Sequence, residues 1–208
     1  MNKNKLFQLT FFFSISLILT FSSCANLSLT PHPKKTPTPT VGEPLPEINL
    51  TSPTDESIRN YLGLTNITAA AFASAQIDCE ILLIEIFSMY CPFCQREAPA
   101  VNKLFKLIQD DPKLSRQIKL IGIGVGNSAF EVEIFKNKYD VKFPLFADAD
   151  FTIHNDMGQV RTPFFIAIAN RGEKKNQVIL TKLGGFSSPD KFLRSLTRRI
   201  EPPVKGEN

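Results

Sequence analysis

Two cysteines, Cys91 and Cys94, directly follow a short apolar run and open a stretch with helical periodicity. The apolar run, Ile81 to Phe87, contains β-branched residues and is typical of a buried strand. A strand that leads into cysteines at the start of a helix places one sulfur at the positive end of the helix dipole. A thiolate is stabilised there, and cysteine pKa values in such sites fall to about 3.5–7.5. The pattern therefore predicts an α/β fold with a redox-active dithiol.

Three other uses of the cysteine pair are weighed against this one. A structural zinc site needs four nitrogen or sulfur ligands, but the chain has no second cysteine pair, and its two histidines, His32 and His154, are far off in sequence. A structural disulfide across two residues closes too short a loop to stabilise the fold much. A peroxide-reducing cysteine is expected in a Pro-x-x-x-Thr/Ser-x-x-Cys pattern; Ser88 matches it, but Ile84 occupies the proline position. The dithiol is favoured, and no metal is expected.

The surroundings of the pair resemble the thioredoxin superfamily, in particular its membrane-anchored bacterial thiol–disulfide oxidoreductases of the TlpA and redoxin type. The resemblance extends from Val41 to Arg199. It rests on an acidic residue six before the first cysteine, on the cysteine pair, on a proline five after the second cysteine and on a distant Thr-Pro. These features are Glu85, Cys91 and Cys94, Pro99, and Thr162-Pro163. The resemblance implies a thioredoxin-like fold, with a mixed central sheet flanked by helices on both faces.

The resemblance and the chemistry of thiols together assign roles around the pair. Cys91 is expected to attack substrate disulfides, and Cys94, one turn into the helix and more buried, to resolve the mixed disulfide. Glu85 is expected to be buried, with a pKa raised by desolvation, and to relay a proton to Cys94. The alternative is a solvated glutamate at a sheet edge. No cofactor is implied.

A substrate-binding surface is also implied beside the thiols. The Thr162-Pro163 peptide bond is expected to be cis and to face the cysteines, so that the backbone of Thr162 can pair with a substrate strand. Tyr90 stands where the family usually has tryptophan, and Pro92-Phe93 replaces the commoner Gly-Pro. Tyr90 and Phe93 flank the thiols, where they form either an apolar landing surface or ordinary packing.

The N-terminus is predicted to direct export. Two lysines precede Leu6 to Phe21, a mostly apolar run that as a helix spans about 24 Å, short of a bilayer core of about 30 Å. A charged start, a short apolar core and small residues at the end are typical of a signal peptide. Phe21-Ser22-Ser23-Cys24 resembles a bacterial lipoprotein cleavage site, which makes 1–23 the signal peptide and Cys24 the lipidated residue. A cut near Ala25 or an uncleaved anchor stays open.

The rest of the chain is predicted to be a tether, one domain and a tail. Residues 24–41 are rich in proline and threonine and lack acidic residues, which predicts an extended tether. Residues 42–201 form the thioredoxin-like domain, and residues 202–208 a disordered tail. Without residues 1–23 the chain has 22 basic and 20 acidic residues, a net charge of +2 with no basic cluster, which argues against nucleic acid binding.

Hydrophobic periodicity predicts the elements of the domain. Helices are expected over 55–62, 68–75, 94–108 with a kink at Pro99, 128–139, 151–157 and from 188, and strands over 118–125, 145–147, 164–169 and 178–183. Ser128 with Glu131 forms a capping box. The glycines of 122–126 follow G-x-G-x-G and not the dinucleotide-binding G-x-G-x-x-G, so that reading is rejected. Cys79 is expected to be an inert buried thiol, and His154 a surface helix residue.

The sequence thus predicts an exported, lipid-anchored thiol–disulfide oxidoreductase on the extracytoplasmic face of the cell envelope, facing the periplasm. By resemblance it reduces disulfides of extracytoplasmic proteins, for instance in cytochrome c maturation, and depends on a membrane thiol electron donor. Two alternatives stay open. One is a disulfide-forming oxidase, with which Pro92 is compatible. The other, from a different class, is a copper-binding or assembly lipoprotein that uses Cys91 and Cys94 as soft ligands.

Overall fold

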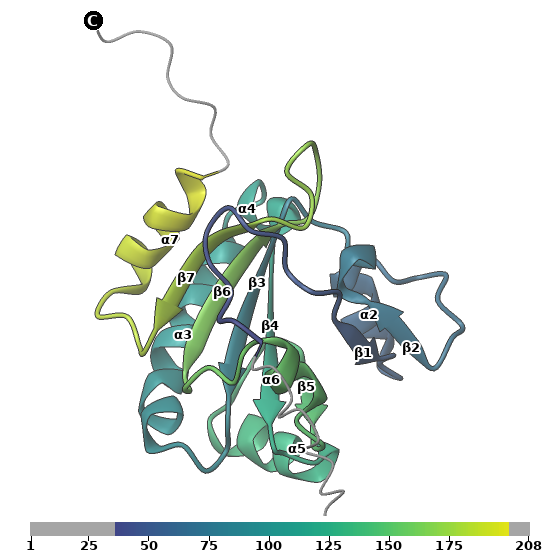
Figure 1. The fold of residues 1–208 in the computed structure, drawn as a ribbon, viewed down its shortest axis with the longest axis vertical. Helices are drawn as coiled ribbons and strands as arrows, with labels where there is room; N and C mark the ends of the chain where they lie inside the picture. Colours follow the sequence, from purple (N-terminus) through teal and green to yellow (C-terminus); the bar gives the residue numbers. More distant parts are fainter. Residues whose placement is uncertain (1–35, 200–208) are drawn as a thin grey trace, which may run out of the picture. The chain divides into compact units, whose positions relative to one another are not determined.

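A five-stranded sheet forms the centre of the computed structural model, which describes residues 36–199 (Figure 1). The strand order is β5-β4-β3-β6-β7. β3, β4 and β5 run parallel, whereas β6 is antiparallel to both β3 and β7, so the predicted mixed sheet is confirmed. The strands are β3 (Ile81–Phe87), β4 (Ile118–Val125), β5 (Leu145–Asp148), β6 (Phe164–Ala169) and β7 (Val178–Leu183).

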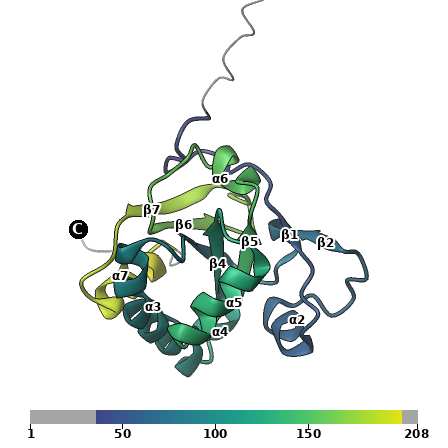
Figure 2. The same cartoon turned by 90° about the horizontal axis from the view of Figure 1, so that it is seen from below.

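Helices cover both faces of this sheet, as predicted (Figure 2). The side chains of β3 alternate between two buried clusters: Leu82, Ile84 and Ile86 belong to one, and Ile81, Leu83 and Phe87 to the other. The first cluster also contains residues of α2 and α6, and the second contains residues of α3, α5 and α7. The helices are α2 (Glu56–Leu62), α3 (Pro92–Asp110), α4 (Leu114–Gln117), α5 (Ala129–Lys138), α6 (Thr152–Asp156) and α7 (Pro189–Thr197).

The segment before β3 corrects one prediction. Residues 68–75 are not a helix: β2 (Ala71–Ala73) pairs antiparallel with β1 (Asn49–Thr51), and a single 3₁₀ turn, Ser74–Gln76, follows. Phe72 is the buried residue of β2, and its ring packs edge-on against Phe146 at 5.8 Å between centroids. Burial of this one ring together with strand pairing outweighs the high helix propensity of the neighbouring alanines. The predicted helix over 55–62 is confirmed as α2.

Glycines in β4 make room for a large aromatic side chain of β3. Phe87 is fully buried, and a Cβ atom at Gly122 or Gly124 would lie 3.3 or 3.1 Å from its ring. The glycine-rich pattern of this strand therefore serves packing of the sheet.

The predicted capping box at the start of α5 is also present, with Ser128 and Glu131 satisfying each other's backbone N–H groups.

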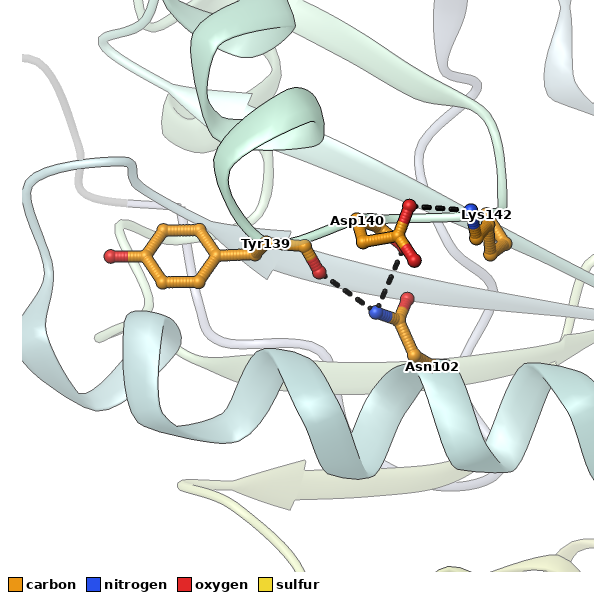
Figure 3. A network of polar contacts seen from close by, with 4 residues as sticks. All are labelled: Asn102, Tyr139, Asp140 and Lys142. Carbon is orange, nitrogen blue, oxygen red and sulfur yellow. Dashed lines mark hydrogen bonds and ion pairs between the residues drawn. The ribbon is translucent and has the colours of Figure 1, made fainter.

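A polar side chain ties α3 to the end of α5 (Figure 3). The Nδ2 atom of Asn102 donates to the carbonyl oxygens of Tyr139, at 2.9 Å, and Asp140, at 3.1 Å. Asp140 is left-handed, with φ of 53°, and forms an ion pair with Lys142. Because α3 carries the cysteine pair at its N-terminus, these bonds help to fix the helix that positions the thiols. Pro99 lies inside this helix, which continues to Asp110.

Several predicted segments lie outside the described residues: the signal peptide 1–23, Cys24, most of the tether and the tail 202–208. The last residues of the tether, from 36 onward, are described, and they contact the domain. Pro39 is buried, and a Cβ atom at Gly158 would lie 2.7 Å from the carbonyl oxygen of Pro37. Within residues 36–199 there is no helix of the length and apolarity needed to cross a membrane.

Candidate active site

The two thiols lie where the central strand β3 ends and α3 begins. Cys91 is the N-cap of α3 and is partly exposed, whereas Cys94 is fully buried one turn into the helix. A turn links strand and helix: the N–H of Cys91 donates to the carbonyl of Ser88 at 3.0 Å, and the N–H of Gln95 donates to the carbonyl of Cys91 at 3.1 Å. Both cysteines are free thiols. One sulfur is therefore reachable from solvent and the other lies behind it.

The surroundings shift the pKa values of the two thiols in opposite directions. Partial burial works against ionisation of Cys91, but hydrogen bonds of its sulfur with Thr162, Cys94 and the backbone of Phe93 outweigh it, so the pKa of Cys91 is lowered. Burial raises the pKa of the Cys94 thiol, and the nearby charges of Cys91 and Glu85 raise it further. Cys91 is thus the sulfur that ionises first, which is the property a nucleophile needs.

Glu85 lies beneath the thiols in the middle of the sheet. It pairs with Gly122 of β4 and Phe165 of β6 and is 2% exposed, so it is not a solvated edge residue. By strand alternation its side chain points to the same face as Leu83 and Phe87, which is the face that α3 covers. Burial, and then the charges of Glu97 and Cys91, raise the pKa of Glu85 to about 8.

A second carboxyl group, which the sequence analysis did not single out, lies near Glu85. Glu97 follows Cys94 by three residues on α3, and its Oε1 atom accepts a 2.8 Å hydrogen bond from the N–H of Phe186, in the segment before α7. Partial burial raises its pKa. Residues three apart on a helix share a face, so an acid three residues after a cysteine was the signal in the sequence. The thiols therefore lie near two carboxyl groups.

The loop before β6 faces Cys91. The Thr162-Pro163 peptide bond is cis, as expected, and the carbonyl oxygen of Thr162 accepts a hydrogen bond from the Cys91 thiol at 3.4 Å. Pro163 is buried and Thr162 half-buried. The backbone of this loop is thus close enough to the reactive sulfur to contact anything bonded to it.

Two aromatic side chains flank the thiols and are exposed. Tyr90 and Phe93 are each 64% exposed, so neither is ordinary core packing. The hydroxyl of Tyr90 donates to the carboxylate of Glu131 on α5, and the guanidinium of Arg96 lies 4.5 Å from the centre of the Phe93 ring. Both rings are available to a substrate.

The backbone between β3 and α3 is fixed by two side-chain amides that the sequence analysis also missed. The N–H of Met89 donates to Oδ1 of Asn127 at 2.8 Å, and its carbonyl accepts from Nε2 of Gln95 at 2.8 Å. Asn127 is fully buried at the end of β4. No local pattern indicates the contact with Asn127, because Asn127 lies 38 residues away from Met89 along the chain.

Cys79 lies at the other end of β3. It is 1% exposed, and burial raises its pKa to about 12. Since the strand between Cys79 and Cys91 spans about 23 Å, the two sulfurs cannot form a disulfide. Cys79 is therefore the buried thiol that was predicted.

His154 lies on α6, half-buried, with Nε2 placed 2.8 Å from the carbonyl oxygen of Val160.

A comparison with protein families assigns this chain to one of them. The model of the AhpC/TSA family matches residues 41–184, a range that contains both cysteines, Glu85 and Thr162-Pro163. The chain belongs to the AhpC/TSA family. This match and the strand order confirm the predicted thioredoxin-like, redoxin-type relationship.

Two curated relatives have the predicted class of activity, and a solved structure has the same fold. The chain is 21% identical over 139 residues to the thiol-disulfide oxidoreductase ResA of Halalkalibacterium halodurans, covering 67% of this chain and 73% of the relative. It is 23% identical over 94 residues to ResA of Geobacillus thermodenitrificans, covering 45% and 51%. The thioredoxin domain of a thiol-disulfide oxidoreductase from Bacteroides vulgatus has the same fold, with a TM-score of 0.56, 11% identity and coverage of 78% and 99%. The prediction of a thiol–disulfide oxidoreductase is confirmed.

Proposed function

We propose that this family member is an exported, lipid-anchored oxidoreductase that reduces disulfides of extracytoplasmic proteins through Cys91 and Cys94. One observation carries the proposal: a partly exposed thiol with a lowered pKa lies in front of a buried thiol with a raised pKa. This asymmetry separates the attacking sulfur from the resolving sulfur. The likeness to the two ResA proteins supports the same reaction.

The first half of the reaction uses Cys91. Its thiolate attacks one sulfur of the substrate disulfide, a Cys91–substrate bond forms, and the substrate's own S–S bond breaks. The departing sulfur leaves as a thiolate and takes a proton from solvent. The carbonyl of Thr162, 3.4 Å from the Cys91 sulfur, lies beside the mixed disulfide that results. Substrate backbone can pair with this loop as an added strand.

The second half uses Cys94 and a buried base. Cys94 loses its proton to the carboxylate of Glu85 and attacks the Cys91 sulfur, so the Cys91–Cys94 bond forms and the substrate's second sulfur leaves and is protonated. Two electrons have then passed from the protein to the substrate. In the proposed cycle a membrane thiol electron donor returns two electrons to the Cys91–Cys94 disulfide.

The direction of the reaction is tested by the reduction potential of the Cys91–Cys94 pair. We expect a value of about −250 mV or lower, in the range of reducing members such as thioredoxin at about −270 mV. The measurement is equilibration of the domain with glutathione buffers of known ratio, followed by quantification of free thiols. A value near −120 mV, typical of a strong oxidant, would establish the disulfide-forming alternative.

The anchor is tested at Cys24. The N-terminal pattern of 1–24 supports lipidation of this residue, and the tether after it supports attachment at a distance from the lipid. We expect Cys24→Ser to leave the domain folded and redox-active but to move it from the membrane fraction to the soluble extract. The measurement is fractionation followed by an insulin-reduction assay on both fractions, with Cys79→Ser as the matched cysteine control. A Cys24→Ser protein that stays with the membrane identifies 6–21 as an uncleaved anchor.

A further inference from the structure

A groove of about 530 Å³ adjoins the reactive thiol. Ser88 and Tyr90, from the loop between β3 and α3, contribute to its lining, as do Phe151 at the start of α6 and Arg161 and Thr162 before β6. The Thr162 carbonyl also contacts the Cys91 sulfur. A polypeptide whose sulfur is bonded to Cys91 therefore has its neighbouring residues next to this groove.

Phe151 has a backbone conformation that bulky residues seldom adopt. Its φ and ψ are 61° and 18°, in the left-handed region, and the residue is 47% exposed. Gly126 leaves space for the ring, because a Cβ atom there would lie 2.5 Å from Cζ of Phe151. An apolar ring held towards solvent by an unfavourable backbone conformation is the kind of feature that clusters at ligand contacts.

Tyr90 supplies a second aromatic surface whose orientation is already set. Its hydroxyl donates to Glu131, and Oε2 of Glu131 is in turn held by the backbone N–H and the hydroxyl of Ser128, each at 2.7 Å. A ring fixed before binding loses little conformational freedom when a ligand packs against it. The groove thus has two exposed rings that do not need to be ordered by the substrate.

The described lining of the groove carries positive charge and no negative charge. Among the described residues that line it, Arg161 carries a positive charge and none is acidic. Arg161 is exposed. The nearby carboxylate of Glu131 is occupied by Tyr90 and Ser128, and the His154 ring by the Val160 carbonyl. A cationic substrate side chain would meet no free carboxylate among these lining residues and would be repelled by Arg161.

We propose that this groove selects the substrate polypeptide, by binding a large apolar side chain next to the reacting cysteine and disfavouring lysine or arginine there. The inference rests on the proposed function and names the substrate class of that site: extended segments in which the cysteine is flanked by aromatic or large aliphatic residues. Phe151 and Tyr90 determine the apolar preference, and Arg161 the discrimination against cations.

The test uses symmetric disulfide dimers of the peptides acetyl-Ala-X-Cys-X-Ala-amide, where X is Phe, Leu, Ala, Glu or Lys. Single-turnover rates with the reduced protein are followed by chromatography, and bis(2-hydroxyethyl) disulfide serves as a probe without side chains. We expect the Phe peptide to react about tenfold faster than the Ala peptide, as partial burial of a phenyl ring implies. The Lys peptide is expected to react more slowly than the Glu peptide.

The variants separate the groove from the thiol chemistry. Phe151→Asn removes the ring but keeps a residue that tolerates the left-handed conformation, and should reduce the Phe/Ala rate ratio to about twofold or less. Phe130→Ala removes a ring that lies outside the groove and is more exposed, at 74%, and should change nothing. Arg161→Glu should reverse the Lys/Glu order. Each peptide rate is divided by the rate of the same variant with bis(2-hydroxyethyl) disulfide, so that any effect of a substitution on the thiol itself cancels. Phe130→Ala should reduce this small disulfide at the wild-type rate.

Each outcome decides one question. A wild-type Phe/Ala ratio below twofold, a ratio retained by Phe151→Asn, or a Lys/Glu order unchanged by Arg161→Glu overturns the groove proposal. Because the Arg161 variant tests the same groove independently, poor folding of Phe151→Asn does not leave the proposal untested. Failure of the wild-type protein to reduce any of the peptides or the small disulfide counts against the proposed function itself.

Discussion

Cys94→Ser is expected to accumulate substrates on Cys91 as mixed disulfides, whereas Cys91→Ser accumulates few or none. Cys91 has the lowered pKa and the exposed sulfur, so it attacks in both the wild-type protein and the Cys94 variant. Without the second thiol nothing breaks the mixed disulfide. In Cys91→Ser the remaining thiol is fully buried and has a raised pKa, which leaves it neither reachable nor ionised at neutral pH.

The measurement is expression of both variants in the host, alkylation of free thiols, and non-reducing electrophoresis followed by mass spectrometry of the adducts. Insulin reduction by either variant should fall to the uncatalysed background. The Cys79→Ser variant is the control and should behave as the wild type. Equal trapping by the two active-site variants contradicts the assignment of attacking and resolving sulfurs. Trapping by neither, combined with tight Cu(I) binding by the wild type, favours the copper-binding alternative.

Glu85→Leu is expected to stabilise the oxidised domain while slowing its turnover. In the protein with free thiols the pKa of Glu85 is raised from its ordinary 4.5 to about 8, chiefly by burial, and the oxidised domain keeps this burial. Between these values the folded protein binds the proton that the unfolded chain has lost, so the stability of the wild type falls as pH rises from about 4.5 to about 8. Leucine removes the ionisable group, and the variant should be more stable by about 1–3 kcal/mol near pH 8.

The stability of the oxidised protein is measured by urea denaturation at several pH values. The free energy of unfolding of the wild type should decline across the window set by Glu85, and that of Glu85→Leu should be flatter. The advantage of the variant should therefore be smallest near pH 4.5 and largest near pH 8. Glu85→Gln is the matched control, because it keeps the volume and a polar group but cannot ionise, and it should share the flatter profile.

Turnover should respond in the opposite direction. When Cys91 is in a mixed disulfide its charge is absent, one of the effects that raise the pKa of Glu85 is removed, and the carboxylate becomes more available to accept the Cys94 proton. Loss of this base should slow the resolving step on the order of a hundredfold at pH 7. The deficit should shrink at higher pH as hydroxide removes the proton instead. Variants that match the wild type in both stability and rate across pH would show that Glu85 has no part in the proton transfer.

The sequence determined the features that depend on neighbours along the chain. The strand over 81–87, the helix that starts after Cys91 and the capping box of Ser128 and Glu131 all follow from short periodic patterns and from local hydrogen bonds. The order of the two thiols followed as well, because a position at a helix start fixes one sulfur at the positive end of the dipole. The burial of Glu85 could be anticipated, since a single acid in an apolar strand run has neighbours that exclude water.

Only the tertiary structure decided the contacts between distant segments. The strand at 71–73 replaced a predicted helix because Phe72 is buried against Phe146, a partner that no local pattern names. The N–H of Phe186 holds the carboxylate of Glu97, and Glu131 sets the orientation of Tyr90. The groove likewise unites segments from three parts of the chain. Such features depend on burial and geometry in the folded protein, and residue spacing carries no information about either across such separations.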